Sequence, residues 1–152
     1  MNANATILVV DDEEVVRRSY QRVLASARCQ VEAVNDGEQA LRALEIRPYD
    51  LVLLDLRMPG LDGMSVLRTM KRRWPQGEVI VITGYPTVDT AKEAIRLGAR
   101  DYLAKPLAPG DVIEAANSAM ELKSWTLRRD GEVARETNIS NGGATAPFGN
   151  AG

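Results

Sequence analysis

Polar side chains of complementary chemistry follow the apolar runs of this sequence. Two carboxylates come directly after the first run, a third after the third run, a hydroxyl after the fourth and an amine after the fifth: Asp11, Asp12, Asp55, Thr83 and Lys105. Three carboxylates in one place would repel one another unless a cation shares them. Mg²⁺ is the natural cation, because it is a hard ion that takes oxygen ligands and usually keeps several waters. These residue types therefore indicate a magnesium site, provided that the fold brings them together.

The same side chains suit phosphoryl transfer. A carboxylate can act as a nucleophile and form an acyl phosphate, provided that metal and fixed positive charge neutralise the developing negative oxygens. Lys105 would supply this charge, and Thr83 would donate a hydrogen bond to a phosphoryl oxygen. Gly84 would leave space beside the phosphoryl group and offer a backbone N–H.

Each of these residues also has a purely structural explanation. Asp11 or Asp12 could cap the helix that follows the first strand, and Thr83 could cap the fourth helix. Helix caps, however, need neither Lys105 nor Asp55. The convergence of complementary groups on one edge therefore favours a functional site over a set of caps.

The elements that must position these residues are an alternation of buried strands and amphipathic helices. Apolar, β-rich runs predict strands at 6–10, 30–34, 51–54, 78–82 and 101–104. Apolar residues at helical spacing follow each run. The fourth helix is expected to begin near Pro86 and end at Gly98, and the last to be entered through Pro109 and to extend to about Trp125.

This alternation predicts the fold class and the place of the site. Strand–helix repeats with short connections favour a doubly wound α/β fold, in which a parallel sheet carries helices on both faces. Such sheets bind ligands outside the carboxyl ends of their strands. Because the polar side chains described above all follow carboxyl ends, we expect them to face one pocket.

Composition limits the function classes. The chain has 152 residues, 45% of them hydrophobic, which suits one domain with its own core and a tail. Its formal charge of −2 comes from interspersed acidic and basic residues, so no basic patch for nucleic acid or an anionic membrane is visible. Without a targeting segment or a membrane-length apolar run, the expectation is a soluble, cytoplasmic protein. One cysteine, Cys29, and no histidine exclude an internal disulfide and a Cys/His zinc site.

Four motifs stand at the expected strand ends. They read VVDDE at residues 9–13, LLDLRMPGLDG at 53–63, ITG at 82–84 and KP at 105–106. Together they resemble the response-regulator receiver family of two-component signalling, over roughly residues 5–124. The resemblance implies a chemotaxis-regulator-like, flavodoxin-like fold, α/β with five parallel strands in the order 2-1-3-4-5. The receiver domain is expected at 1–124, followed at 125–152 by a helix extension and a flexible tail. The tail is expected because residues 128–152 have too few apolar side chains to offset the entropy of ordering them.

The resemblance assigns a role to each acidic residue. Asp55 would accept a phosphoryl group from a sensor histidine kinase or a histidine phosphotransfer protein. Asp12 and Asp55 would ligate Mg²⁺ with the backbone carbonyl of Arg57, and Asp11 would act through a metal-bound water. Arg57, which is larger than the residues common at this place, is expected to alter the lifetime of the acyl phosphate. The domain would catalyse only its own phosphorylation and dephosphorylation, and would not be an enzyme for a separate substrate.

The resemblance also implies how the phosphoryl group is held and read. Thr83 and Lys105 would hold it, with the backbone N–H of Gly84, and the peptide bond from Lys105 to Pro106 is expected to be cis. Thr83 and Tyr102 would form the switch, since an aromatic ring at this place swings into space that the threonine vacates.

The expected output is a protein–protein contact. The switch would alter the face formed by the fourth helix, the fifth strand and the fifth helix, which would bind an unidentified output protein and is also the face through which a homodimer would form. The stretch 82–90 resembles receivers that precede enhancer-dependent transcription activators. No direct contact with nucleic acid or membrane is expected. Leu122, Trp125 and Leu127 are expected to extend the last helix as packing or as a docking surface.

Three other readings fit less well. Haloacid-dehalogenase-type phosphatases use the same chemistry, but their nucleophile follows the first strand as Asp-x-Asp, whereas Asp11 and Asp12 are adjacent here. A degenerate receiver that serves only as a scaffold would lack a site residue, and none is missing. A flavodoxin-like cofactor binder would need a Gly- or Thr-rich phosphate loop after the first strand, which this sequence does not have.

Overall fold

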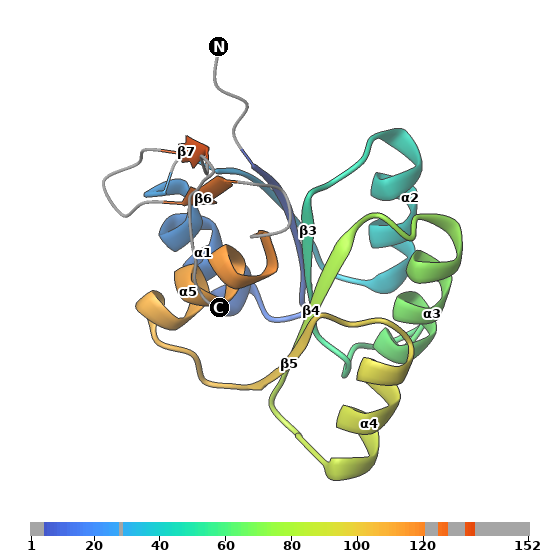
Figure 1. Cartoon of the computed structure of the whole chain (residues 1–152). Helices are drawn as coiled ribbons and strands as arrows, with labels where there is room; N and C mark the ends of the chain where they lie inside the picture. Colours follow the sequence, from blue (N-terminus) through green and yellow to red (C-terminus); the bar gives the residue numbers. More distant parts are fainter. Residues whose placement is uncertain (1–4, 28, 121–124, 128–132, 136–152) are drawn as a thin grey trace, which may run out of the picture.

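A five-stranded parallel sheet with helices on both faces forms the body of the molecule (Figure 1). The computed structural model describes residues 5–27, 29–120, 125–127 and 133–135. The strands are β1 (Thr6–Val10), β2 (Gln30–Val34), β3 (Leu51–Leu54), β4 (Glu78–Thr83) and β5 (Asp101–Ala104). The helices are α1 (Glu14–Ala25), α2 (Gly37–Ile46), α3 (Gly63–Arg73), α4 (Val88–Arg96) and α5 (Pro109–Met120). The strand order β2-β1-β3-β4-β5 confirms the predicted doubly wound, flavodoxin-like fold.

The two faces of the sheet carry separate apolar clusters. Side chains of a strand alternate between faces, so Ile7 and Val9 of β1 pack in the cluster that also holds residues of α1 and α5, such as Leu24 and Ala116. Leu8 of β1 packs instead in the cluster with residues of α2 and α3. Burial on both faces explains why the strands read as continuous apolar runs.

Local signals account for most of the helix boundaries. The Thr87 hydroxyl accepts a hydrogen bond from the backbone N–H of Thr90 at 3.0 Å, so Thr87 caps α4 one residue after Pro86. Gly98 follows the end of α4 with φ of 110°, a conformation that favours glycine. The predicted boundaries of this helix were therefore close, although Pro86 precedes the cap instead of forming the first turn.

The expectation that Trp125 and Leu127 extend the last helix is wrong, whereas Leu122 lies outside the described residues. The described part of α5 ends at Met120, and β6 (Trp125–Leu127) pairs in antiparallel fashion with β7 (Val133–Arg135). Aromatic and β-branched residues in 125–127 favour a strand, and the sequence between the two strands contains the hairpin dipeptide Asp-Gly. The rest of the expected flexible tail lies outside the described residues.

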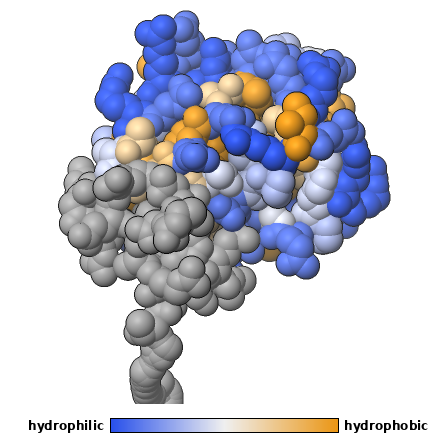
Figure 2. Space-filling view, turned by 90° about the horizontal axis from the view of Figure 1, so that it is seen from above, coloured by the Kyte–Doolittle hydropathy of each residue, from blue (hydrophilic) through white to orange (hydrophobic). Residues whose placement is uncertain are grey.

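The amino-terminal edge of the sheet differs in character from the carboxyl edge. Figure 2 views the molecule from above Figure 1, onto the amino-terminal edge, and shows apolar side chains gathered between polar ones. A cavity of about 350 Å³ lies at this edge, with Leu44, Tyr49, Met70 and Trp74 among its mainly apolar lining. It holds no cluster of ionisable groups suited to catalysis. Within the described residues, no helix is long and apolar enough to cross a membrane.

Cys29 lies half-buried beside the cluster of α1 and α5. Burial, with a smaller contribution from the charge of Asp50, raises the pKa of its thiol to about 12. The thiol is therefore protonated at neutral pH, and Cys29 serves as a small packing residue.

Candidate functional site

A cavity of about 710 Å³ opens at the carboxyl edge of the sheet. Its lining comes from the loops that follow β1, β3, β4 and β5: Asp12, Glu13, Asp55, Leu56, Arg57, Met58, Pro59, Asp62, Gly84, Tyr85 and Lys105. The site therefore lies where the fold class predicts it.

The backbone ladder of the sheet extends to the acidic residues. The N–H of Asp11 donates to the carbonyl of Val34 at 3.2 Å, and the N–H of Asp55 donates to the carbonyl of Val10 at 2.9 Å. Asp11 and Asp55 are only 2% and 4% exposed, so both carboxylates are held by rigid, buried backbone. Asp12, in contrast, is exposed.

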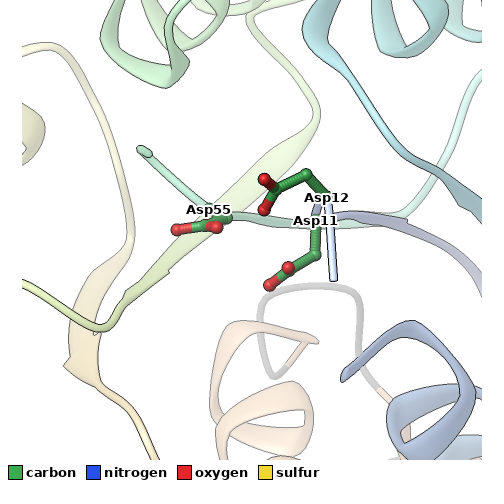
Figure 3. A group of neighbouring side chains, drawn as sticks. All are labelled: Asp11, Asp12 and Asp55. Atoms are coloured by element: carbon green, nitrogen blue, oxygen red, sulfur yellow. The ribbon is translucent and has the colours of Figure 1, made fainter. Parts of the chain in front are cut away.

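The three aspartates form one acidic cluster. Asp11, Asp12 and Asp55 each offer one carboxylate oxygen, and these oxygens lie within 4.8 Å of one another. Figure 3 shows the three carboxylates around one space beside the ends of β1 and β3. The donor set consists of hard oxygen atoms, two of them on buried side chains, and this fits a divalent cation such as Mg²⁺.

Lys105 is the cation that the protein itself places against this cluster. Its Nζ lies 2.7 Å from an oxygen of Asp11, 3.4 Å from Glu13 and 3.5 Å from Asp55. Burial alone would lower the pKa of Lys105, but the hydrogen bond and charge of Asp11, with the charges of Asp55 and Glu13, outweigh it and raise the pKa. Lys105 is therefore a permanent cation at neutral pH.

The negative charge of Asp55 is only partly compensated by its neighbours. Burial and then the nearby charge of Asp11 raise its pKa above the ordinary value, and Lys105 and the backbone N–H of Arg57 oppose them only in part. The N–H of Arg57 donates to Asp55 Oδ1 at 3.3 Å. One ammonium thus faces the carboxylates of Asp11, Asp55 and Glu13, and a further cation would relieve the crowding.

The loop after β3 approaches the next helix closely. A Cβ atom at Gly63 would lie 2.5 Å from the Asp55 carbonyl oxygen and 2.5 Å from Leu56 Cα, which is too close for any other residue. The N–H of Gly63 also donates to the Leu56 carbonyl at 3.1 Å. Gly63 therefore lets the start of α3 pack directly beneath Asp55.

The expectation that all five polar side chains face one pocket is wrong, because Asp11 does not line the main cavity and neither does Thr83. Thr83 is buried at the end of β4, and its Oγ1 accepts a hydrogen bond from the N–H of Tyr85 at 3.1 Å. It lines a second cavity of about 360 Å³, together with residues that include Leu56, Thr87 and Thr90.

Gly84 and the lysine–proline pair complete the sequence-predicted set. A Cβ atom at Gly84 would meet only Lys105 Cδ, at an ordinary 3.9 Å, so the protein alone does not require glycine there. Gly84 lines the main cavity, and the space beside it stays open to a ligand. The peptide bond from Lys105 to Pro106 is cis, the isomer that the resemblance implies.

Two neighbours of the site, Glu13 and Tyr85, were not predicted from the sequence. Glu13 contacts Lys105, and only its place next to the aspartate pair could have pointed to it. The guanidinium carbon of Arg57 lies 4.0 Å from the centre of the Tyr85 ring, so the two side chains stack at the rim of the main cavity. Arg57 follows Asp55 by two positions in the loop after β3, and Tyr85 follows Thr83 by two positions in the loop after β4. Only the pairing of β3 with β4 shows that these two loops are neighbours.

Tyr102 lies on β5, half-buried beside the cluster of α2 and α3. Its hydroxyl accepts a hydrogen bond from the N–H of Thr87 at 3.2 Å and lies 2.5 Å from Thr90 Oγ1. The ring is therefore joined to the first turn of α4.

The fold and the acidic site define a receiver-type signalling domain, and comparison with known proteins gives the family. The response regulator receiver domain model matches residues 7–117, and the chain belongs to this family. It is 38% identical to the regulatory protein AtoC of Escherichia coli (strain K12) over 125 residues, covering 82% of this chain and 27% of AtoC. It is also 38% identical to the DNA-binding transcriptional regulator NtrC of the same strain over 109 residues, covering 72% of this chain and 23% of NtrC.

Solved structures agree with the family. A CheY-like response regulator receiver domain protein from Methanospirillum hungatei JF-1 matches with a TM-score of 0.77 at 25% identity, covering 80% of this chain and 97% of that one. The receiver domain of NtrX from Brucella abortus matches with a TM-score of 0.72 at 36% identity, covering 76% of this chain and 98% of that one.

These findings establish a receiver domain of two-component response regulators, and the phosphatase alternative has no support. The chain spans less than a third of the length of the curated relatives named here.

Proposed function

We propose that Asp55 accepts a phosphoryl group from a sensor histidine kinase or a histidine phosphotransfer protein. The supporting observation is the cluster of Asp11, Asp12 and Asp55 against the fixed cation of Lys105. A carboxylate oxygen of Asp55 attacks phosphorus and the phosphorus–nitrogen bond of the phosphohistidine breaks. The phosphohistidine ring carries a proton on its other nitrogen, so it leaves as the neutral imidazole with the electron pair of the broken bond. The product is an acyl phosphate, which water hydrolyses to restore Asp55 and release inorganic phosphate. Both steps are catalysed by the domain itself.

The remaining residues of the site divide between metal binding and phosphoryl binding. Asp12, Asp55 and the Arg57 carbonyl would hold Mg²⁺, with Asp11 acting through a bound water. The metal would supply positive charge to the phosphoryl oxygens. The Lys105 ammonium already lies within 3.5 Å of three acidic side chains. It would turn from one of these carboxylates to contact a phosphoryl oxygen.

Thr83 and Gly84 would bind the phosphoryl group from β4. The Thr83 hydroxyl would turn from the Tyr85 N–H to donate to a phosphoryl oxygen, and the backbone N–H of Gly84 would donate beside it. Movement of Thr83 would draw the loop that follows β4 toward Asp55.

Tyr102 would report this movement on the surface. The Tyr102 hydroxyl contacts Thr87 and Thr90, which line a cavity together with Thr83, and the ring would move into this cavity as Thr83 moves away. The face of α4, β5 and α5 would then bind an output protein, or a second copy of this chain. Exposed apolar side chains of this face, such as Val88 and Ile95, suit such a contact.

Intact-mass spectrometry after incubation with Mg²⁺ and acetyl phosphate tests the phosphoacceptor. The native chain should gain one hydroxylamine-labile phosphoryl group, and Asp55→Ala should gain none. Asp62→Asn is the matched control, since Asp62 lines the same cavity but serves as the cap of α3, accepting a hydrogen bond from the Ser65 N–H at 2.9 Å. Labelling of Asp55→Ala equal to that of the native chain would place the acceptor elsewhere and refute the proposal.

A further inference from the structure

Helix α4 is weakly anchored by apolar contacts. Ala94 is its one buried residue, whereas Val88 and Ile95 are 70% and 51% exposed. Because hydrophobic stabilisation scales with the apolar area removed from water, this helix gains little from burial. Its polar contacts therefore carry unusual weight in fixing its position.

The polar contact at the first turn of α4 is a closed chain of hydrogen bonds. The Thr87 N–H donates to the Tyr102 hydroxyl at 3.2 Å. The Tyr102 hydroxyl lies 2.5 Å from Thr90 Oγ1, and the Thr90 hydroxyl can donate to the Thr87 carbonyl at 3.3 Å. Thr90 Oγ1 also lies 2.8 Å from the Thr87 hydroxyl, so the Thr90 hydroxyl joins the Tyr102 hydroxyl to Thr87, the capping residue of α4.

This chain of bonds lies at the far end of the loop that begins at Thr83. Only Gly84, Tyr85 and Pro86 separate Thr83 from Thr87. Thr83, Thr87 and Thr90 line the same cavity of about 360 Å³. Displacement of this loop must therefore either carry Tyr102 along or break its bond to α4.

We propose that Thr90 is a positioning residue of the switch, which ties the Tyr102 hydroxyl to α4 and resists movement of the loop 83–87 toward Asp55. The inference rests on the proposed phosphoacceptor function and deepens it. Part of the free energy of phosphoryl binding must break the bond between Thr90 and Tyr102, so this bond lowers the affinity of the site. A weaker bond between Thr90 and Tyr102 therefore lets the site bind a phosphoryl mimic more tightly.

Beryllofluoride titration in the presence of Mg²⁺ tests this role with four variants and the native chain. Thr90→Val removes the hydroxyl while retaining shape, and Thr90→Ser restores a hydroxyl. Tyr102→Phe removes the other partner, and the double variant combines Thr90→Val with Tyr102→Phe. Thr90→Val should bind beryllofluoride about threefold to tenfold more tightly than the native chain, the factor that one net hydrogen bond provides. Thr90→Ser should bind like the native chain, and the double variant should bind no more tightly than the tighter-binding single variant.

The same titration gives the outcome that would overturn the proposal. An unchanged dissociation constant in Thr90→Val, or additive effects in the double variant, would show that the tie does not resist the switch. Should the native chain itself fail to bind beryllofluoride, the proposed function would fail on its own. The tie would then be judged by side-chain NMR of Tyr102 in the unliganded chain, where Thr90→Val should change the ring's rotamer population and Thr90→Ser should not.

Discussion

Asp55 is buried among like charges, and this arrangement costs stability when no metal is bound. Its pKa is raised by burial and by Asp11, so the folded chain binds a proton at Asp55 more readily than the unfolded chain does. Stability therefore falls as pH rises from the ordinary carboxyl range through this raised value, because the folded state must lose the additional proton. The buried like charges thus lower the stability of the fold and favour the binding of a cation and a phosphoryl group at the site.

Replacement of Asp55 by Asn should consequently stabilise the metal-free chain. We expect a gain of about 1 to 4 kcal/mol at neutral pH, toward the lower end because Lys105 already offsets part of the repulsion. The gain should shrink as pH falls below the raised pKa of Asp55 and should also shrink when saturating Mg²⁺ stabilises the native chain. Urea unfolding in EDTA and in Mg²⁺, at several pH values, measures both trends. A gain that is the same at every pH would contradict the electrostatic origin.

Arg57 and Tyr85 form the rim of the cavity through their stacked side chains. The stack covers one side of the opening through which water must reach an acyl phosphate on Asp55. Arg57→Asn should shorten the phosphoryl lifetime about twofold to fivefold, the factor that corresponds to losing an exposed cation–π contact of about 0.5–1 kcal/mol. Loss of radiolabelled phosphate with time measures the rate, with Arg57→Lys as the charge-preserving control. An unchanged rate in Arg57→Asn would remove any role of the rim in water access.

At the scale of elements, the close packing of the loop after β3 against α3 depends on one missing side chain. Gly63→Ala places a methyl group 2.5 Å from backbone atoms of Asp55 and Leu56, which cannot rotate away. We expect a loss of about 1–3 kcal/mol of unfolding free energy, as for other overpacked sites, and weaker beryllofluoride binding because the displaced backbone carries Asp55. Gly110→Ala is the matched control.

The control works because Gly110 lies in α5 with nothing within 4 Å of the added Cβ atom. Alanine there should stabilise the helix by about 0.5–1 kcal/mol. Urea unfolding of the two variants compares them directly. Equal stability of Gly63→Ala and the native chain would mean that the loop can yield without cost.

Sequence patterns predicted the elements where one strong local or periodic signal dominated. Parallel strands buried on both faces require continuous apolar runs, and the strand order then brings Asp11, Asp55 and Lys105 to one edge. The contacts of Glu13 and Tyr85 were not predictable, because they depend on side-chain directions across loops from different strands. Residues 125–127 were wrongly predicted as helix for a related reason: the pairing of β6 with β7 is a contact between segments, which helical periodicity does not encode.

At the scale of the whole molecule, the boundary of the receiver domain near residue 124 remains a prediction. Among the side chains that the structure describes, which end at Met120, both apolar clusters are complete without the hairpin of β6 and β7. β6 and β7 form their own two-stranded sheet, which shares no strand with the five-stranded sheet, although β6 lies against α5. Folding of the receiver should therefore not require the hairpin.

A chain that ends after Ser124 should keep its urea midpoint and its affinity for beryllofluoride. The expected change in unfolding free energy is within about 0.5 kcal/mol, the range of changes away from the core. A second chain that ends after Glu136 retains β6 and β7 and serves as the matched control. A loss of more than about 2 kcal/mol in the shorter chain alone would show that the hairpin packs as part of the receiver core, since a loss of that size requires buried contacts. The domain would then extend to β7, and the contact of β6 with α5 would belong to the receiver.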